Sequence, residues 1–226
     1  KLKELVKKES NIEVKTVKTK YPQGGERLLI YAATGRKINS SLLPFHVGCI
    51  VNNVDTVISI FKAVAESTPL MRRIVTVTGD AVKNPCNFNV KIGTNYRELI
   101  EAADGFNKEP EKIISGGPMM GQALFSLDIP VTKTSSALLC IADDKPAKMQ
   151  STACISCGRC VDVCPSRVIP KKLFEYSELS DGESFAKLNG MECCECGCCS
   201  YVCPARLNLT QSFKQMRKSI LDSRKK

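Results

Sequence analysis

Eight cysteines near the carboxyl end of this 226-residue sequence form one pattern that occurs twice. Each block has three cysteines spaced three residues apart and a fourth cysteine four residues later, followed directly by proline. Every cysteine of the second block lies 39 positions after its counterpart in the first. The two blocks are Cys154, Cys157, Cys160 and Cys164-Pro165, and Cys193, Cys196, Cys199 and Cys203-Pro204. So regular a repeat indicates the duplication of a binding unit.

The spacing predicts two [4Fe–4S] clusters. A short loop with a sulfur at every third residue can cover three corners of a cubane, so another segment must supply the fourth thiolate. In bacterial two-cluster ferredoxins, the last cysteine of each block binds the other cluster. We therefore expect one cluster on Cys154, Cys157, Cys160 and Cys203, and the other on Cys193, Cys196, Cys199 and Cys164. Zinc is the alternative, although structural zinc sites usually use two Cys-x2-Cys pairs.

The remaining cysteines fit a cytosolic, reducing location. The total of thirteen is odd, which excludes complete disulfide pairing within one chain. No signal peptide is visible, and the longest apolar run, about residues 137–142, is far too short to span a membrane. Cys194 and Cys198 are interpreted as spare loop thiols that could replace a neighbouring ligand. Cys49, Cys86 and Cys140 are interpreted as buried apolar residues.

The region around the cysteine blocks is predicted to be helical. Residues 171–179 and 183–188 have the apolar spacing of helices. Asn208 can cap a further helix, whose apolar positions include Leu209 and Phe213. Its other face carries Lys214, Arg217 and Lys218, in a chain with a net charge of +10. That face is either simply solvated or a docking surface for an acidic redox partner or a membrane.

The first half of the chain suggests a mixture of strands and helices. A helix over 54–66 has apolar residues at the i, i+3, i+4, i+7 positions, and Asn52-Asn53 precede it. Free N–H groups at such a helix start suit a phosphate, although asparagine is also an ordinary N-cap. Strands are expected at 12–17, 28–32, 47–51, 74–78 and 88–92, a short helix at 96–103 and a strand at 112–114. The segments after residue 72 suggest a small β-grasp-like module without catalytic residues.

The order of several motifs carries a family resemblance. These motifs are Gln23-Gly-Gly-Glu26, Val51-Asn-Asn-Val-Asp-Thr56, Val77-Thr-Gly-Asp-Ala81, Ser115-Gly-Gly-Pro-Met-Met-Gly121, Pro130-Val-Thr-Lys133 and the two cysteine blocks. Together they resemble the family of C subunits of the Rnf electron transport complex, a ferredoxin:NAD+ oxidoreductase that couples electron transfer to ion pumping. The likeness extends from about residue 12 to 210.

This resemblance implies an α+β chain in three parts. They are a partial flavin-domain α/β segment over 1–71, an SLBB module (soluble-ligand-binding β-grasp) over 72–128, and an all-α ferredoxin-like domain with two [4Fe–4S] clusters over 129–226. In the family, the segment matching Gly25 and Glu26 faces flavin and nicotinamide. The segment matching Val51, Asn52, Asn53 and Thr56 holds FMN, with the asparagine pair near its phosphate.

The family's glycine-rich loop, which supplies much of the FMN contact, is absent here. We therefore expect a partial FMN site in this chain and a complete one only in a longer protein. The implied function is electron transfer between an NAD(H)/FMN site and other carriers, as part of an ion-translocating oxidoreductase on the cytoplasmic face of the cell membrane. The implied partners are the other Rnf membrane and iron–sulfur subunits and NAD(H), with ferredoxin indirectly.

Two other functions fit parts of the same pattern. A flavin and iron–sulfur reductase of a corrinoid or amino-acid fermentation system has related modules and a different acceptor. A zinc-stabilised binding module, which the positive charge would suit to nucleic acid, is the more distant alternative. Aromatic residues make up only 6% of the chain and tryptophan is absent, so no stacking platform accompanies the basic residues. We therefore expect no nucleic acid partner.

Overall fold

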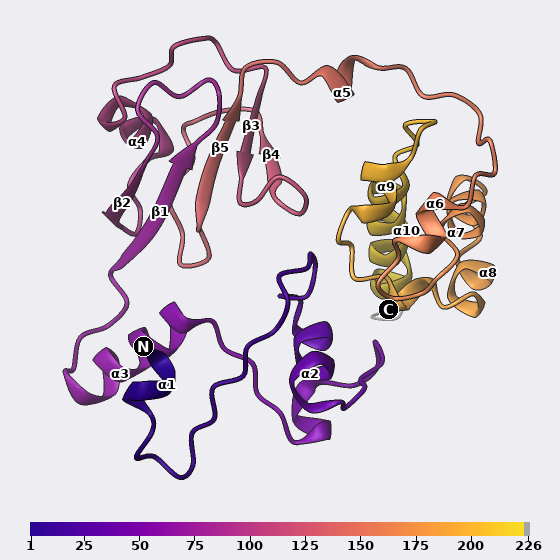
Figure 1. Ribbon diagram of the computed structural model, residues 1–226. Coiled ribbons are helices and arrows are strands. Elements are labelled where there is room, and N and C mark those ends of the chain that lie inside the picture. The colour runs from indigo at the N-terminus through magenta and orange to yellow at the C-terminus, as the bar shows by residue number, and fades with distance from the viewer. Residues whose placement is uncertain (224–226) are drawn as a thin grey trace. The chain divides into compact units, whose positions relative to one another are not determined.

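The computed structural model describes residues 1–223, and the chain divides into two compact units, Lys1–Asn53 and Val54–Lys226 (Figure 1). The first unit contains two α-helices and one 3-10 helix: α1 (Leu2–Leu5), α2 (Glu26–Thr34) and η1 (Pro44–Val47). Gly35 ends α2 in a left-handed conformation, at φ 74°, and its N–H donates to the carbonyl of Tyr31. Arg36 Nη1 donates to the carbonyl of Val47 at 2.6 Å and so connects α2 to η1.

The three strands expected before residue 54 were wrong. Residues 12–17 are irregular, and residues 28–32 lie inside α2. Residue 47 is the last residue of η1, and residues 48–51 form no ladder. A helix satisfies its own backbone hydrogen bonds, whereas a strand needs a partner strand. Apolar β-branched residues favour a strand only where such a partner is present, and this unit contains no paired strand among its residues 1–53.

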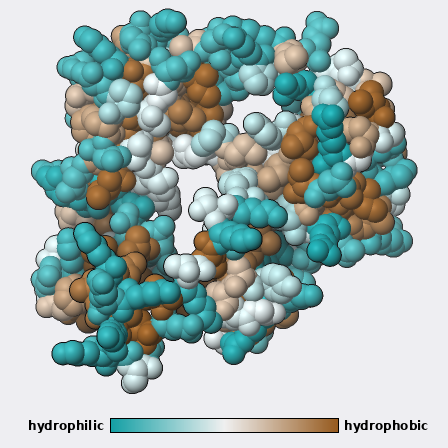
Figure 2. All heavy atoms as spheres, in the orientation of Figure 1, coloured by the Kyte–Doolittle hydropathy of each residue, from teal (hydrophilic) through white to brown (hydrophobic). Residues whose placement is uncertain are grey.

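The second unit begins with α3 (Val54–Ala65), which confirms the predicted helix. The apolar residues on its predicted inner face are all exposed, including Val54 (69%), Phe61 (60%) and Val64 (81%). Figure 2 shows apolar side chains at the surface where Figure 1 places α3. Within the described part of the chain, α3 is therefore an amphipathic helix whose apolar side stays open to solvent.

A five-stranded sheet follows, in the order β2-β1-β5-β3-β4. Strand β1 pairs with β5 in parallel, and the other neighbours are antiparallel. The strands are β1 (Arg72–Thr78), β2 (Cys86–Lys91), β3 (Lys112–Ser115), β4 (Gln122–Leu124) and β5 (Ala137–Ile141). Strand β5 belongs to this sheet, so the predicted boundary between the second and third domains, at residue 128, falls between two strands of one sheet. The division into three domains stays a prediction.

Helix α4 (Tyr96–Ala102) completes the core of this sheet. Asn95 caps the helix by accepting a hydrogen bond from the N–H of Arg97. The Tyr96 ring is fully buried, and its hydroxyl donates to Ser135 at 2.9 Å, so its polar end is satisfied. The core residues are Val75, Val77, Ala81, Val82, Tyr96, Leu99, Ile100, Ala103, Val131, Leu138 and Cys140.

The carboxyl-terminal part is helical, as predicted. After α5 (Lys145–Lys148), it contains α6 (Arg159–Asp162), α7 (Pro170–Glu178), α8 (Gly182–Lys187), η2 (Gly190–Glu192), α9 (Cys198–Val202) and α10 (Leu209–Ser223). Helix α10 packs against α7, α8 and α9. Its Phe213 and the Phe185 of α8 are fully buried, with ring centroids 6.1 Å apart. The core of this region thus joins α10 to segments on both sides of the second cysteine block.

The three isolated cysteines were expected to be buried, and this is confirmed only for Cys140. Burial raises the pKa of its thiol to about 11. Cys86 is exposed on the edge strand β2, and Cys49 is half-buried after η1. Over residues 1–223, no helix combines the length and the apolar character needed to cross a bilayer.

We predict that Gly79→Ala unfolds or strongly destabilises the sheet. Gly79 has φ 124°, and a Cβ there would overlap the backbone of Cys140 in β5. The loss in free energy of unfolding should be about 3 kcal/mol or more, because backbone cannot give way as a flexible side chain can. Urea unfolding followed by circular dichroism measures it.

Gly93→Ala is the matched control for this prediction. Gly93 also has positive φ, 97°, but nothing lies within 4 Å of the added methyl group. It should lose only the conformational strain of about 1–2 kcal/mol. Equal losses in the two variants would show that the close approach to Cys140 is unimportant.

Candidate functional site

The two cysteine loops share one backbone conformation. Three pairs of residues, each 39 positions apart, have positive φ angles that agree within a few degrees. They are Ser156 and Glu195 (56° and 55°), Gly158 and Gly197 (78° and 82°), and Arg167 and Arg206 (53° and 54°). Positive φ costs a non-glycine residue about 1–2 kcal/mol, so four such costs are repeated in register. The duplication seen in the sequence is therefore also a duplication of shape.

Each loop turns its backbone toward its first cysteine. The N–H of Ser156 donates to Cys154 Sγ at 3.4 Å, and the N–H of Glu195 donates to Cys193 Sγ at 3.4 Å. These donors come from the residues with left-handed conformation, so the strained backbone and the hydrogen bond to sulfur belong together. Hydrogen bonds to cysteine sulfur stabilise the thiolate and help to set cluster potentials.

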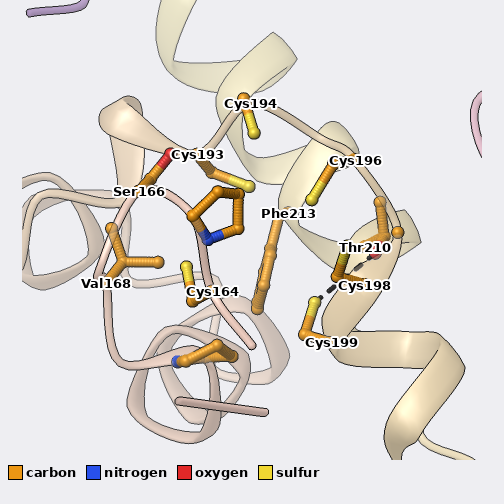
Figure 3. A pocket seen from close by; sticks show the side chains of 13 residues that line it. Cys164, Ser166, Val168, Cys193, Cys194, Cys196, Cys198, Cys199, Thr210 and Phe213 are labelled. Carbon is orange, nitrogen blue, oxygen red and sulfur yellow. Dashed lines mark hydrogen bonds between the residues drawn. The ribbon is translucent and has the colours of Figure 1, made fainter. Parts of the chain in front are cut away.

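The last cysteine of the first block lies beside the second block. Cys164 lines one cavity together with Cys193, Cys196 and Cys199, which is the set of four predicted for one cluster (Figure 3). The cavity opens to solvent, and the unfilled space within and in front of it, solvent included, is about 310 Å³. Its wall also includes Pro165, Val168, Pro170, Thr210 and Phe213.

The segments of the other predicted set also approach one another. The N–H of Thr152, two residues before Cys154, donates to the carbonyl of Ala205, two residues after Cys203. Helices α6 and α9, which follow the two loops, pack together. Cys160 and Cys203 are half-buried against the helical core, whereas Cys154 and Cys157 are exposed. The ligand assignment for both clusters stays a prediction.

This donor set fits iron–sulfur clusters. Four thiols from two segments surround one hollow, and backbone N–H groups donate to their sulfurs. Within residues 1–223, no three side chains of His, Cys, Asp or Glu converge on one ion position. A cubane does not need such convergence, because each of its four irons takes a single thiolate.

Burial keeps the metal-free thiols protonated. It raises the pKa of Cys193 to about 11 and also raises the pKa values of Cys199 and Cys160. Hydrogen bonds oppose this effect: the hydroxyl of Thr210 lies 3.6 Å from Cys199 Sγ, and the Lys171 backbone lowers the pKa of Cys160. Iron binds the thiolate form, so cluster assembly must release these protons.

Arg217 contributes a positive charge next to the second loop. It was predicted to lie on the basic outer face of the last helix, but its side chain is only 19% exposed and pairs with Glu195. Its charge lowers the pKa of Cys193, although burial has the larger effect. Its Nε is buried, and no partner for it lies within residues 1–223. This half-buried guanidinium favours negative charge at Cys193, and its pairing with the Glu195 carboxylate offsets part of the effect.

The residues predicted for FMN lie where two helices begin. Gly25 is the N-cap of α2 and Glu26 is its first residue; Asn52 and Asn53 directly precede α3, and Thr56 lies in its first turn. Backbone N–H groups at helix starts suit a phosphate, so these positions are compatible with part of a flavin site. Val51 is half-buried and the other five residues are exposed. None of the six lines the cysteine cavity.

Two cysteines and a threonine that line the cavity lie outside the predicted set of ligands. Cys194 and Cys198, interpreted as spare thiols, both line the cavity. Thr210 reaches Cys199 because Ser200 accepts a hydrogen bond from its N–H at 2.9 Å. No sequence signal pointed to Thr210, since its contact depends on the packing of α10 beside α9.

Comparisons with known proteins agree with this architecture. A family model for the Nuo51 FMN-binding domain matches residues 1–62, one for the SLBB domain matches residues 74–123, and one for a 4Fe-4S dicluster domain matches residues 153–207. The chain is therefore an iron–sulfur dicluster protein with FMN-binding and SLBB segments.

Individual relatives define the family more closely. The chain is 44% identical over 170 residues to the C subunit of the Na+-translocating ferredoxin:NAD+ oxidoreductase complex of Acetobacterium woodii, covering 75% of this chain and 38% of the relative. It is 44% identical over 164 residues to the C subunit of the proton-translocating complex of Clostridium ljungdahlii (73% and 36%). The C subunit of an ion-translocating oxidoreductase complex of Yersinia pestis is 37% identical over 176 residues (77% and 28%).

Over about three quarters of its length, the chain is thus similar to C subunits of ion-translocating ferredoxin:NAD+ oxidoreductase complexes, the Rnf complexes. It spans between 28% and 38% of the length of these curated relatives.

We predict that two quadruple variants, which differ only in whether Cys164 or Cys203 is changed, distinguish two ligand arrangements. Either the last cysteine of each block binds the other block's cluster, or it binds the cluster of its own block. With Cys164, Cys193, Cys196 and Cys199 all changed to alanine, one complete cluster should survive, giving about four irons per chain and a [4Fe–4S] signal on reduction. With Cys203 changed in place of Cys164, both ligand sets are broken and no [4Fe–4S] signal should appear. Iron analysis and electron paramagnetic resonance measure both.

A wild-type sample and Cys86→Ala serve as controls, because Cys86 is exposed on the sheet far along the chain from both blocks. Both should contain about eight irons. A [4Fe–4S] signal in the Cys203 set together with its loss in the Cys164 set would show that each block binds its own cluster.

Proposed function

We propose that this chain relays electrons within an ion-translocating ferredoxin:NAD+ oxidoreductase, through two [4Fe–4S] clusters. The main support is the cavity that Cys164 shares with Cys193, Cys196 and Cys199, within the segment matched by the dicluster model. A hollow lined by four thiols from two segments meets the ligand demand of one cubane. The duplicated backbone conformation extends the same argument to the first block.

The proposed role needs no acid–base pair. The clusters, when bound, supply reversible one-electron chemistry. The protein holds the thiolates, donates N–H groups to their sulfurs, and surrounds the second site with Val168, Pro170 and Phe213. The charge of Arg217, partly offset by its partner Glu195, would favour the more negative, reduced state of a cluster bound near Cys193 and so raise its potential.

The first unit and α3 connect this relay to a flavin. Gly25, Glu26, Val51, Asn52, Asn53 and Thr56 all fall within residues 1–62, the range of the FMN-binding match. We propose that they form one side of an FMN and NAD(H) site, with the asparagine pair at the flavin phosphate. The proposed domains stay 1–71, 72–128 and 129–226, with β5 as the strand that returns from the third to the sheet of the second.

Other subunits are the proposed partners. The relatives are named as subunits of translocating complexes, so this chain should exchange electrons with the membrane and iron–sulfur subunits of such a complex, and with ferredoxin indirectly. We place it at the cytoplasmic face of the cell membrane, held there by those subunits.

We predict that the anaerobically purified chain is brown and contains about eight irons and eight sulfides. Reductive titration should consume about two electrons per chain, one for each cluster, and the reduced protein should pass them to a one-electron acceptor dye. Optical bleaching and electron paramagnetic resonance follow the titration. A colourless protein that contains zinc and takes up no electrons would overturn the proposal.

We predict that the double change of Asn52 and Asn53 to alanine weakens FMN binding about tenfold, the effect of losing about 1.4 kcal/mol of hydrogen bonding to phosphate. The measurement is quenching of flavin fluorescence, in a polypeptide that also carries the family's glycine-rich loop ahead of residue 1. Asn11→Ala is the control, because Asn11 is exposed in the same unit and precedes neither helix. If the unchanged protein, the double variant and the Asn11→Ala control bind FMN equally well, the asparagine pair does not contribute to the site.

A further inference from the structure

The cavity at the second loop contains more thiols than one cubane can use. Six cysteines line it, Cys164, Cys193, Cys194, Cys196, Cys198 and Cys199, whereas a [4Fe–4S] cluster takes four. The predicted ligand set leaves Cys194 and Cys198 over. Both surplus thiols line the cavity together with the predicted ligands (Figure 3).

Cys194 lies next to a predicted ligand in space as well as in sequence. The left-handed conformation of Glu195, at φ 55°, reverses the chain between Cys194 and Cys196. Side-chain hydrogen bonding with Cys194, and to a smaller extent with Cys198, raises the pKa of Cys196, so both thiols lie close to it. In Figure 3, the sulfur of Cys194 points into the space between Cys193 and Cys196. Exchange of Cys194 for Cys196 therefore requires only a small local shift.

The local backbone favours Cys194 over Cys198 for such an exchange. Residues 193–196 lie outside any helix or strand, and after the bond from the Cys193 N–H to the Gly190 carbonyl no backbone ladder holds them, so the loop can adjust. Cys198 is the first residue of α9, and the N–H of Tyr201 donates to the carbonyl of Gly197 directly before it. The helix thus fixes the direction of the Cys198 side chain.

The first loop provides an internal comparison. The residues that match Cys194 and Cys198, 39 positions earlier, are Ile155 and Arg159. Ile155 is 66% exposed and cannot bind iron. The first loop has the same backbone and the same ligand spacing, but it has no additional thiol.

We propose that Cys194 is a reserve ligand of the second cluster, able to replace Cys196. In the exchange, the iron–sulfur bond to Cys196 breaks and one to Cys194 forms, while the thiol proton of Cys194 moves to the sulfur of Cys196. No electron is gained or lost. This inference rests on the proposed function, since it requires a cluster at this site.

The test compares the same substitution in the two loops, with alanine, which offers no ligand atom. Cys157→Ala should lower the iron content from about eight to about four per chain, whereas the matching Cys196→Ala should retain about eight. Adding Cys194→Ala to Cys196→Ala should bring the content to about four, and adding Cys198→Ala should leave it at about eight. Iron and sulfide analysis measures all four variants, and electron paramagnetic resonance shows which cluster persists.

The results distinguish failure of the reserve ligand from failure of the proposed function. Loss of the second cluster in Cys196→Ala alone overturns the reserve ligand and leaves the proposed function intact, provided that the wild type contains about eight irons. Retention in the Cys194/Cys196 double variant, with loss in the Cys196/Cys198 double variant, overturns the role of Cys194 and assigns it to Cys198. A wild type without iron overturns the proposed function itself.

Discussion

A cubane cluster accepts one thiolate at each of four irons, and a short loop can supply only three of them. This constraint explains the unusual local features of the carboxyl-terminal region. Residues in left-handed conformation turn each loop, and Pro165 and Pro204 prevent the last cysteine of each block from continuing a helix. Cys164 is thereby directed to the cavity of the second block. The strain recurs at the same two places in both loops, at Ser156 and Glu195 and at Arg167 and Arg206, which indicates that it serves the ligand geometry.

The same region contains a conflict between burial and charge. An apolar helical core surrounds the cavity, and it favours neutral thiols at Cys193 and Cys199. Ligation requires thiolates. Backbone N–H groups, the Thr210 hydroxyl and Arg217 reduce this cost but do not remove it, since the pKa values of these thiols stay raised. Metal binding should therefore contribute substantially to the stability of this domain.

The parts that were predictable from sequence depend on local information. The cysteine spacing, the helices near residues 54–65, 170–178 and 209–223, and the turn between β1 and β2 follow from neighbouring residues. The expected strands in residues 1–53 failed, because pairing depends on distant segments; Gly25 and Gly35, which bound α2, were the local signals for a helix there. The cavity position of Thr210 and the pairing of Arg217 with Glu195 depend on tertiary packing, which no spacing reveals.

The position of helix α10 in the chain determines when the core of this region can form. It supplies Leu209, Phe213 and Met216, three of the seven residues in the buried core beneath the clusters, and it follows both cysteine blocks in the chain. During translation, all eight block cysteines leave the ribosome before this helix does. Until it arrives, the core lacks three of its seven buried residues, and the thiols of the nascent loops are more open to oxidants and stray metal ions. Cluster insertion in the cell should consequently be a late event, completed after synthesis of the helix that closes the core.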